Sequence, residues 1–547
     1  MNVLGVSRRW HCALVACASA LAAGGLQGAS AHGAPPQSDL GSDRCARPIA
    51  VAERFGTDVT GWETSGEIRF GDRLVPVSRP LEVLAGPPRG VAWYLWFHSW
   101  SWMTEVARES GPSAAVDLAW VWHLANPDVG GEASRQAQRV TGWTEGAVTQ
   151  RMTTVTCLWT LTGDERLRDV MQALVAASLD ESRYYGRPRV APHNRGAMAN
   201  FALMAAGEEF GEPEWVGAAR QRLSTDFPEV FAECGMDREQ SASYFRHNHR
   251  LWTRAHSLIA TQGDDSLGHL VAERLGAASV ALRALTLPSG LLPPIGDGSP
   301  VAGPLPSTDD ELHWWCEERG WAAGRDSWTA PSTHYTVRFG PAMTAHGHDD
   351  HGSVTWWVGV GGGMAVLVDR GNPAKDRDPS RREWARSKAA HNTFAPKGLD
   401  YRTSSTATRT LADDSVGFAI VDRSLHWGVA RHRAVDISLD SAHLVVTDSG
   451  ESIRPRTWVQ SWQLHPQWSV DSMAGGVATA RHTNGSVLTI NCTGQSGGAS
   501  GLVRMRLHSV PQFGVRGAEA SAHTVTCESV GLQVSLRTSL SVEASVT

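Results

Sequence analysis

The spacing of the apolar residues changes once along the chain, and this change constrains the fold more than any other feature of the sequence. From about residue 88 to residue 290, apolar residues recur every three or four positions in segments of helix length. After about residue 330 they alternate with polar residues or form short β-branched runs, separated by Gly, Asn, Asp and Ser. This pattern predicts a helical array or an α/α toroid, followed by an antiparallel β-sandwich.

The same pattern gives the bounds of the expected elements. Helices are predicted at residues 91–106, 114–124, 145–161, 165–179, 197–206, 213–223 and 249–260. Strands are predicted at residues 334–339, 354–369, 433–439, 443–448, 457–464, 486–491, 502–507 and 531–536. The segment 291–324, rich in Pro and Gly at its start, is predicted to join the two parts. We therefore predict a helical domain over residues 45–310 and a β-sandwich domain over residues 311–547.

The N-terminus has the features of a secretory signal. Arg8 and Arg9 precede an apolar stretch of small residues at 13–26, and Ala29-Ser30-Ala31 forms an A-x-A cleavage site. We predict a signal peptide over residues 1–31; residues 7–10 also resemble a twin-arginine signal, and residues 14–17 a lipoprotein box. No later stretch has the roughly 18 consecutive apolar residues of a membrane span. The prediction is an exported protein (secreted, periplasmic or in the cell envelope) without an integral membrane segment.

The cysteines are compatible with export. After the signal peptide, six remain: Cys45, Cys157, Cys234, Cys316, Cys492 and Cys527. No two have C-x-x-C spacing, which argues against a cysteine zinc site. Disulfides form outside the cytosol, and Cys492 with Cys527 is the first pair to test, since both lie in neighbouring strand-like segments. Buried free thiols are an equally good interpretation of the sequence.

The charge balance excludes one class of partner. The chain has 50 Lys and Arg against 56 Asp and Glu, a net charge of −6, which argues against a nucleic-acid-binding protein that acts through bulk positive charge. An acidic polysaccharide remains a suitable partner where a groove concentrates arginines such as Arg338. The 23 Trp residues, against 6 Tyr and 12 Phe, suit hydrophobic cores and also the faces of sugar rings.

The densest group of ligating side chains is His346-Gly347-His348-Asp349-Asp350-His351, between two predicted strands. Imidazole nitrogen and carboxylate oxygen are ordinary zinc ligands outside thiolate sites. A zinc ion needs further ligands, and Asp369 and His391 follow at strand ends in the same half of the chain. A solvated polar loop is the alternative interpretation of this cluster.

The stretch 335–394 resembles the C-terminal signature of the heparinase II/III-like polysaccharide lyases. The resemblance rests on His346-Gly347-His348-Asp349, on an apolar strand closing on Asp369-Arg370-Gly371, and on Ala390-His391-Asn392-Thr393. Families acting on glycosaminoglycans and alginate combine an incomplete α/α toroid with an antiparallel β-sandwich. The resemblance implies that His348, Asp369 and His391 bind a zinc ion or another divalent ion in a structural role. It also implies that His346 faces the substrate.

Two helical segments extend the resemblance. In the family an Asn-His pair contacts the uronate carboxylate; Asn194 matches, Arg195 stands where the histidine is expected, and His193 lies one place early. The segment 236–244 resembles the family's Glu-x-Ser-x-x-Tyr pattern, which implies that Tyr244 is the catalytic tyrosine and that Glu239 orients the site. Taken by themselves, the two segments also suit a helix-capping loop and a tyrosine packed on a helix surface.

The resemblance implies a carbon–oxygen lyase that cleaves a uronic-acid-containing polysaccharide by β-elimination. The uronate C5 proton is weakly acidic, because the neighbouring carboxylate is anionic. Neutralising this carboxylate stabilises the transition state, and Asn194 with Arg195 or His193 suits the task. A base removes the proton and an acid protonates the departing oxygen at C4, and Tyr244 and His346 are the expected acid/base residues.

Two other functions fit parts of the sequence. Helical toroids also host glycoside hydrolases, which would use carboxylates such as Glu239 and Asp297 and would form no new double bond. A non-catalytic glycan-binding envelope protein would keep the fold with a substituted cleft. Both remain alternatives to the lyase at this point.

Overall fold

The computed structural model of the chain describes residues 43–54, 56–71, 73–76, 97–128, 142–184, 194–260, 265–305, 307–340, 346–373, 379–399, 405–496, 499–500, 503–514 and 518–545. The predicted signal peptide at 1–31 lies outside these described residues. The chain divides into two compact units, one made of residues 1–142 and 150–174 and the other of residues 143–149 and 175–547.

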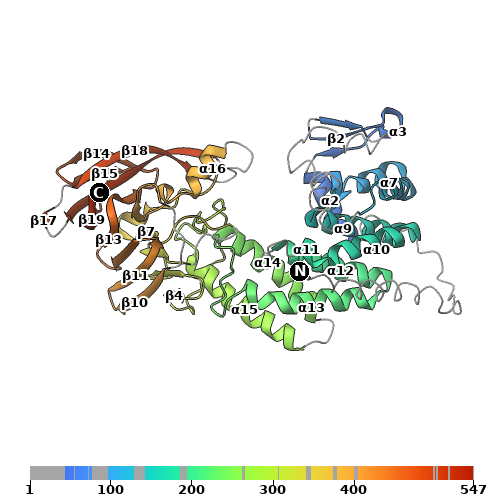
Figure 1. Cartoon of the computed structure of the whole chain (residues 1–547), viewed down its shortest axis with the longest axis horizontal. Coiled ribbons are helices and arrows are strands. Elements are labelled where there is room, and N and C mark those ends of the chain that lie inside the picture. The colour runs from blue at the N-terminus through green and yellow to red at the C-terminus, as the bar shows by residue number, and fades with distance from the viewer. Residues whose placement is uncertain are drawn as a thin grey trace, which may run out of the picture. The chain divides into compact units, whose positions relative to one another are not determined.

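The first unit combines helices with a small antiparallel sheet (Figure 1). Its elements are α2 (Asp43–Arg54), β1 (Thr57–Asp58), α3 (Trp62–Ser65), β2 (Glu67–Phe70), β3 (Arg73–Pro76), α6 (Met103–Ser110), α7 (Pro112–Ala125) and most of α9 (Glu145–Thr162) and α10 (Arg166–Leu179). The strands β1, β2 and β3 pair in that order. The sequence pattern did not predict them, because strands of two to four residues are too short to display an alternation.

Tryptophan side chains form much of the interior. In the first unit, Trp100 and Trp122 meet edge to face with ring centroids 5.1 Å apart. The guanidinium of Arg151 lies 4.7 Å from the Trp122 ring and donates to the backbone carbonyl of Gly142. In the described part of the chain, nine tryptophans are almost completely buried, namely Trp100, Trp102, Trp143, Trp252, Trp321, Trp356, Trp458, Trp462 and Trp468. These tryptophans therefore belong to the protein interior and are not available to contact sugar rings.

The helices of the second unit precede its sheets. They are α11 (Glu181–Tyr184), α12 (Asn194–Phe210), α13 (Pro213–Val230), α14 (Ala242–Ala260) and α15 (Asp265–Leu285). α12 packs against α13 and α14 against α15, so that consecutive helices form hairpins (Figure 1). α15 lies in the region expected to be helical but outside the predicted segments, because Gly268 and Gly276 weaken its apolar pattern. No helix in the described part of the chain is both long and apolar enough to cross a bilayer.

Two antiparallel sheets form the rest of the second unit. The smaller contains β4 (His313–Cys316), β5 (Trp321–Arg325), β6 (His334–Arg338), β7 (Val354–Val358) and β8 (Met364–Leu367) in sequential order. The larger has the order β10-β11-β12-β13-β19-β16-β15-β14, with β9, β17 and β18 joined to its members. Its strands are β9 (Phe394–Pro396), β10 (Thr406–Ala412), β11 (Ser415–His426), β12 (Val429–Ser438), β13 (His443–Gln463), β14 (Trp468–Ala474), β15 (Val477–His482), β16 (Val487–Ser496), β17 (Ala499–Ser500), β18 (Arg504–Phe513) and β19 (Glu519–Glu543).

One hydrophobic core joins the two sheets. Tyr335, Val337 and Val366 of the smaller sheet share a buried cluster with Ile437, Val446 and others of the larger one. The alternation along β12, where every second residue is buried, is the pattern of a strand with one face on a core. The segments predicted separately at 443–448 and 457–464 are one strand, β13, with a register shift between Glu451 and Arg456.

Three disulfides crosslink the described residues. Cys45 is bonded to Cys157 in the first unit, and in the second Cys234 is bonded to Cys316 and Cys492 to Cys527. The suggested pairing of Cys492 with Cys527 is confirmed, and their Cα atoms lie 6.5 Å apart. The sequence did not predict the other two pairs, because their partners are separated by 112 and 82 residues.

The Cys234–Cys316 bond should contribute strongly to stability. Replacing both cysteines by serine should lower the free energy of unfolding by about 2–4 kcal/mol, because the bond closes a loop of 82 residues in the unfolded chain. Urea unfolding followed by circular dichroism measures this loss. The matched control is the double replacement of Cys492 and Cys527 by serine. Their disulfide closes a loop of only 35 residues, so its loss should lower the free energy of unfolding by less. Equal stability of the parent and the Cys234/Cys316 variant would contradict the prediction.

Candidate active site

A tight turn at Gly296 brings the predicted site segments together. Gly296 has a φ of +77°, and a Cβ at this position would lie 2.7 Å from the backbone oxygen of Gln240 and 2.8 Å from that of His346. The Asp297 amide donates to the same His346 oxygen at 2.7 Å. Because only glycine fits this close approach, the junction turn holds the loop before α14 next to the histidine-rich segment.

Tyr244 and His346 are in direct contact. Tyr244 lies in the first turn of α14, and His346 opens the segment that leads into β7. Their rings are stacked with centroids 3.5 Å apart and an interplanar angle of 12°. Both side chains are partly exposed, so the pair is reachable from solvent. The structure thus unites the two residues expected to perform acid/base chemistry, although about one hundred positions separate them in sequence.

His346 lies between two buried carboxylates. Its Nδ1 is 3.3 Å from Asp297 Oδ2, and its Nε2 is 3.8 Å from Glu239 Oε2. Since a carboxylate only accepts, the Nδ1–H of His346 donates to Asp297. This bond fixes the orientation and the tautomer of the imidazole and leaves Nε2 on the Glu239 side.

Glu239 connects His346 to the beginning of α12. Its Oε1 accepts the backbone N–H of Asn194 at 3.1 Å, while its Oε2 is buried without a hydrogen-bond partner. Asp237 lies behind it and accepts from Asn248 Nδ2 at 2.6 Å. Burial, followed by the negative charge of Glu239, raises the pKa of Asp237 well above its usual range. Asn194 and Glu239 therefore lie next to the Tyr244–His346 pair, as the resemblance implies.

Asp297 is a residue of this site that the sequence suggested only as a carboxylate of the alternative glycoside hydrolase. Its carboxylate is buried, and two arginines of α16 (Pro379–Arg386) reach it. The donors are His346 Nδ1 at 3.3 Å, His348 Nε2 at 3.0 Å, Asn372 Nδ2 at 2.7 Å, Arg382 Nη2 at 3.3 Å and Arg386 Nη1 at 3.2 Å. Its place in the Gly296-Asp297-Gly298 turn gave no sign of these donors, because an Asp there equally suits a turn residue.

The surroundings of Asp297 keep it ionised. Burial alone would raise the pKa of this carboxyl, but the hydrogen bonds from His346 and His348 and the positive charge of Arg386 hold it well below its usual value. A carboxylate with this many donors is suited to positioning other groups. It is poorly suited to act as a general acid, which has to carry a proton.

The predicted substrate-binding arginines differ in exposure, since Arg195 lies at the surface and Arg338 is buried. Arg195 is exposed beside Asn194, and its charge partly offsets the burial that raises the pKa of Glu145 to about 7. His193 lies outside the described residues. Arg338 does not have the position predicted for it in a substrate groove. Its side chain is 1% exposed, and its guanidinium pairs with Asp350 at 3.2 Å and lies over the Trp321 ring. It stabilises the interior and does not line a substrate groove.

The residues predicted to bind a metal lie close to one another. His391 Nδ1 donates to Asp369 Oδ2 at 2.6 Å, and the rings of His391 and His348 have centroids 5.4 Å apart. His391 Nε2 and His348 Nδ1 are buried without hydrogen-bond partners. Two imidazoles and a carboxylate are suitable zinc ligands. Among the described residues, however, no three His, Cys, Asp or Glu side chains are arranged as a metal site.

The electrostatics of these histidines differ. Burial lowers the pKa of His348, even though its hydrogen bond to Asp297 opposes this shift. Burial also acts against the charged form of His391, but Asp369 and Asp350 outweigh it and raise the pKa of His391. His391 in this arrangement is therefore stabilised by its ion pair with Asp369.

Comparisons with known proteins identify the C-terminal part. A family model described as heparinase II/III-like, C-terminal, matches residues 309–530. No curated protein matches the chain. A structure of heparinase III has a TM-score of 0.67 at 13% identity, covering 93% of this chain and 87% of that one. A mutant of the heparan sulfate lyase HepC from Pedobacter heparinus has a TM-score of 0.63 at 14% identity, covering 94% and 86%.

A more distant structure has the same layout. The Streptomyces coelicolor A3 chondroitin AC lyase in complex with chondroitin sulphate has a TM-score of 0.51 at 11% identity, covering 93% of this chain and 81% of that one. These likenesses confirm the predicted fold class, a helical toroid followed by an antiparallel β-sandwich. Residues 309–530 match the model of the heparinase II/III-like C-terminal family, and the chain has the fold of the solved structures named heparinase III and HepC.

Proposed function

We propose that this protein is a polysaccharide lyase that cleaves a uronic-acid-containing chain by β-elimination. The observation that carries the proposal is the Tyr244–His346 stack, with Glu239 and the first residue of α12, Asn194, beside it. The likeness to structures named heparinase III and chondroitin AC lyase supports the same reaction class.

The chemistry assigns a task to each residue. The side chain of Asn194, assisted by the neighbouring Arg195, binds the uronate carboxylate and stabilises the charge that builds on it. Tyr244 or His346 removes the C5 proton, and the electron pair forms the C4–C5 double bond as the C4–oxygen bond breaks. The departing oxygen takes a proton from the other member of the pair. The products are a fragment with an unsaturated uronate at its new non-reducing end and a fragment with a new reducing end, whose anomeric hydroxyl is the protonated departing oxygen.

The test is an assay on purified chain with heparan sulfate, hyaluronan, chondroitin and alginate. A lyase produces the ultraviolet absorbance of an unsaturated uronate on at least one of these polymers. New reducing ends without that absorbance would establish a glycoside hydrolase instead. Neither signal on the whole panel would favour a non-catalytic glycan-binding protein. The donors around Asp297 disfavour the hydrolase, because they oppose protonation of this carboxyl.

Removing the carboxylate-binding amide should slow the reaction. Asn194→Ala should lower kcat by roughly 10²–10³, the usual loss for one donor to a developing anion. The backbone N–H of residue 194, which binds Glu239, remains in this variant, so the fold should be kept. Asn484→Ala, in a turn of the larger sheet, is the matched control and should retain full activity. Equal rates for Asn194→Ala and the control would exclude the role of Asn194.

We further propose that His348, Asp369 and His391 hold a zinc ion or another divalent ion in a structural role. The two buried, unpartnered imidazole nitrogens support the proposal. Metal analysis of the purified parent should find close to one ion per chain, and His348→Ala should lose it. His249→Ala, in α14 away from these residues, should keep the parent's metal content. Equal metal in the parent and His348→Ala would refute this assignment.

We also propose that the chain is exported and that its signal peptide is removed. The support is the sequence at 1–31 and the three disulfides, which form outside the cytosol. Expression of the full sequence with fractionation and N-terminal sequencing of the product tests this, and a mature chain beginning near His32 is expected.

A further inference from the structure

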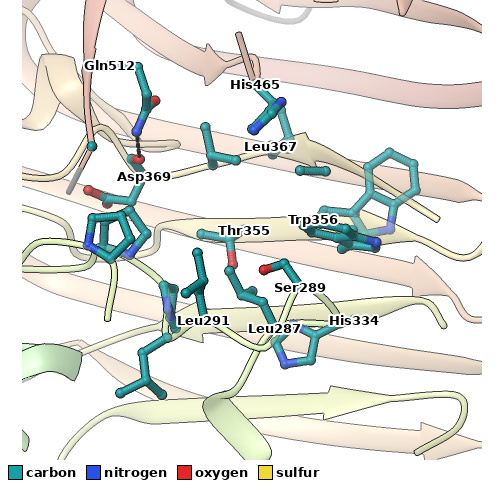
Figure 2. Close-up of a pocket in the computed structure, with 18 of the residues that line it drawn as sticks. Leu287, Ser289, Leu291, His334, Thr355, Trp356, Leu367, Asp369, His465 and Gln512 are labelled. Carbon is teal, nitrogen blue, oxygen red and sulfur yellow. Dashed lines mark hydrogen bonds between the residues drawn. The ribbon is translucent and has the colours of Figure 1, made fainter. Parts of the chain in front are cut away.

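A cavity of about 300 Å³ lies in the second unit, away from Tyr244 and His346 (Figure 2). It is bounded by the outer side of β7 and β8, by the segment between α15 and β4, and by residues near 465 and 513. Figure 2 shows Asp369 and Gln512 at one end of it and His334 and Trp356 at the other, with Thr355 and Ser289 between them. Of the residues assigned above to the candidate site and its predicted metal ligands, only Asp369 also lines this cavity.

The walls of this cavity are apolar and almost uncharged. Leucine, proline and aromatic side chains form most of the lining, including Leu287, Leu291, Pro293, Leu367 and Phe513. Among the described lining residues, none is Lys or Arg, and Asp369 is the only carboxylate. An anionic ligand would find no opposite charge here, and its desolvation would be uncompensated.

Four buried polar atoms of the described lining have no hydrogen-bond partner. They are Thr355 Oγ1, His334 Nδ1, Trp356 Nε1 and Trp357 Nε1, and Thr355, His334 and Trp356 are each at most 5% exposed. Such atoms are uncommon in folded proteins, because an unsatisfied buried polar group costs about 1–3 kcal/mol. Four of them line this one apolar cavity, so a ligand that fills it can supply the missing partners.

The hydrogen bonds of two histidines define what the ligand must offer. His334 Nε2 donates to the backbone oxygen of Ala284 at 2.9 Å, so His334 Nδ1 carries a lone pair and accepts. Burial lowers the pKa of His334 to about 3, which keeps this ring neutral. His465 Nδ1 accepts the Gln467 N–H at 3.4 Å, so its proton is on Nε2. The lining therefore presents an acceptor as well as indole, imidazole and hydroxyl donors, which one ligand hydroxyl group can match.

We propose that this cavity binds a small, uncharged, largely apolar molecule with a hydroxyl group, such as an aromatic alcohol. The apolar body occupies the space between Leu291 and Leu367, and the hydroxyl bonds with His334, Thr355 or Trp356. A volume near 300 Å³ is at the lower end for small-molecule sites and fits one ring with a short substituent. This inference does not rest on the proposed lyase activity, since the acidic polysaccharide has the wrong charge for this cavity.

Calorimetric titration of the purified chain with benzyl alcohol, toluene and benzoate tests the proposal. Benzyl alcohol should bind saturably, and benzoate should bind about tenfold more weakly or not at all, because no cation offsets its desolvation. Thr355→Val keeps the side-chain shape and removes the hydroxyl. It should weaken benzyl alcohol binding roughly fivefold, the effect of one lost hydrogen bond, and leave toluene binding unchanged.

The controls separate this site from a general effect on the sheet. Thr336→Val removes another buried, unpartnered hydroxyl of the same sheet that does not line the cavity, and it should leave all three affinities unchanged. Leu291→Trp fills the cavity and should abolish binding of both benzyl alcohol and toluene, which keeps the test decisive if Thr355→Val folds poorly. Absence of saturable benzyl alcohol binding to the parent would overturn the proposal. Equal affinities for benzoate and benzyl alcohol would do so too.

Discussion

Replacing Tyr244 by phenylalanine should lower the rate of unsaturated uronate formation by at least roughly 10³-fold, within the range for loss of a general acid or base. The phenylalanine ring retains the stacking on His346, whose centroid lies 3.5 Å away, so the variant removes only the hydroxyl. The melting temperature should therefore remain close to that of the parent. Initial rates on the best polymer of the panel, together with a thermal melt, measure both quantities.

Tyr335→Phe is the matched control for this experiment. Tyr335 is a buried tyrosine of β6 whose hydroxyl bonds with His313 Nδ1 at 3.0 Å, remote from the site segments in the fold. Its variant should keep the parental rate and lose a little stability through the missing hydrogen bond. If Tyr244→Phe retained the parental rate, the acid/base role would have to pass to His346 alone.

Replacing Asp297 by asparagine should disturb both activity and stability. The amide cannot accept from His346, His348, Asn372 and two arginines as the carboxylate does, so the orientation of His346 is lost. We expect kcat to fall by about 10²-fold or more, with little change in KM, because Asp297 acts through His346 and not on the substrate. Asp310→Asn, which breaks an ion pair with Arg283 away from the site, should leave kcat unchanged.

The same variant should change the dependence of stability on pH. The pKa of Asp297 in the folded chain lies below its unfolded value of about 3.9, so the ionised carboxylate stabilises the fold above that pH. This contribution is lost as the pH falls below about 4 towards the folded-state pKa. Urea unfolding between pH 3 and pH 7 (about two midpoints per unit) should show a shallower acid loss for Asp297→Asn than for the parent. Parallel curves would show that Asp297 does not contribute this stability.

The pattern of apolar residues predicted the architecture because secondary structure is a local property. The period of 3.6 located α9, α10 and α12, and the period of two located β6 and β12, within a few residues. The segment predicted as one strand at 354–369 is two strands, β7 and β8, separated by a turn at Val360–Gly362. The short strands β1 to β3 were missed, and β13 was divided in two where its register shifts. The pairing of β13 with β19, some seventy residues apart, follows from tertiary packing that no local pattern contains.

The site was predictable only in part. Motifs located Tyr244, Asn194, Glu239 and His346, and the structure brings them together, because each motif carries a chemical signature of its own. Asp297 was considered only as a carboxylate of the alternative hydrolase. Its bonds to His346 and the other donors were not predicted, because an Asp between two glycines is an ordinary turn residue and its five donors come from three distant segments. Arg338 was misjudged for the opposite reason, since a sequence does not reveal that an arginine is buried against Trp321 and Asp350.

The residues around the Tyr244–His346 pair come from different parts of the chain, and this limits which segments can be exchanged between related proteins. Tyr244 and Glu239 belong to the helical stretch of the chain, His346 to the segment that opens the sheets, and Asp297 to the junction between them. Neither stretch contains all of the proposed reacting groups. Replacing one stretch by its counterpart from a relative should therefore abolish the proposed activity, unless the turn at Gly296 is kept with its contacts. Chimeras between relatives should therefore be spliced outside residues 194–386, so that Asn194, the Tyr244–His346 pair and the donors of Asp297 are inherited together.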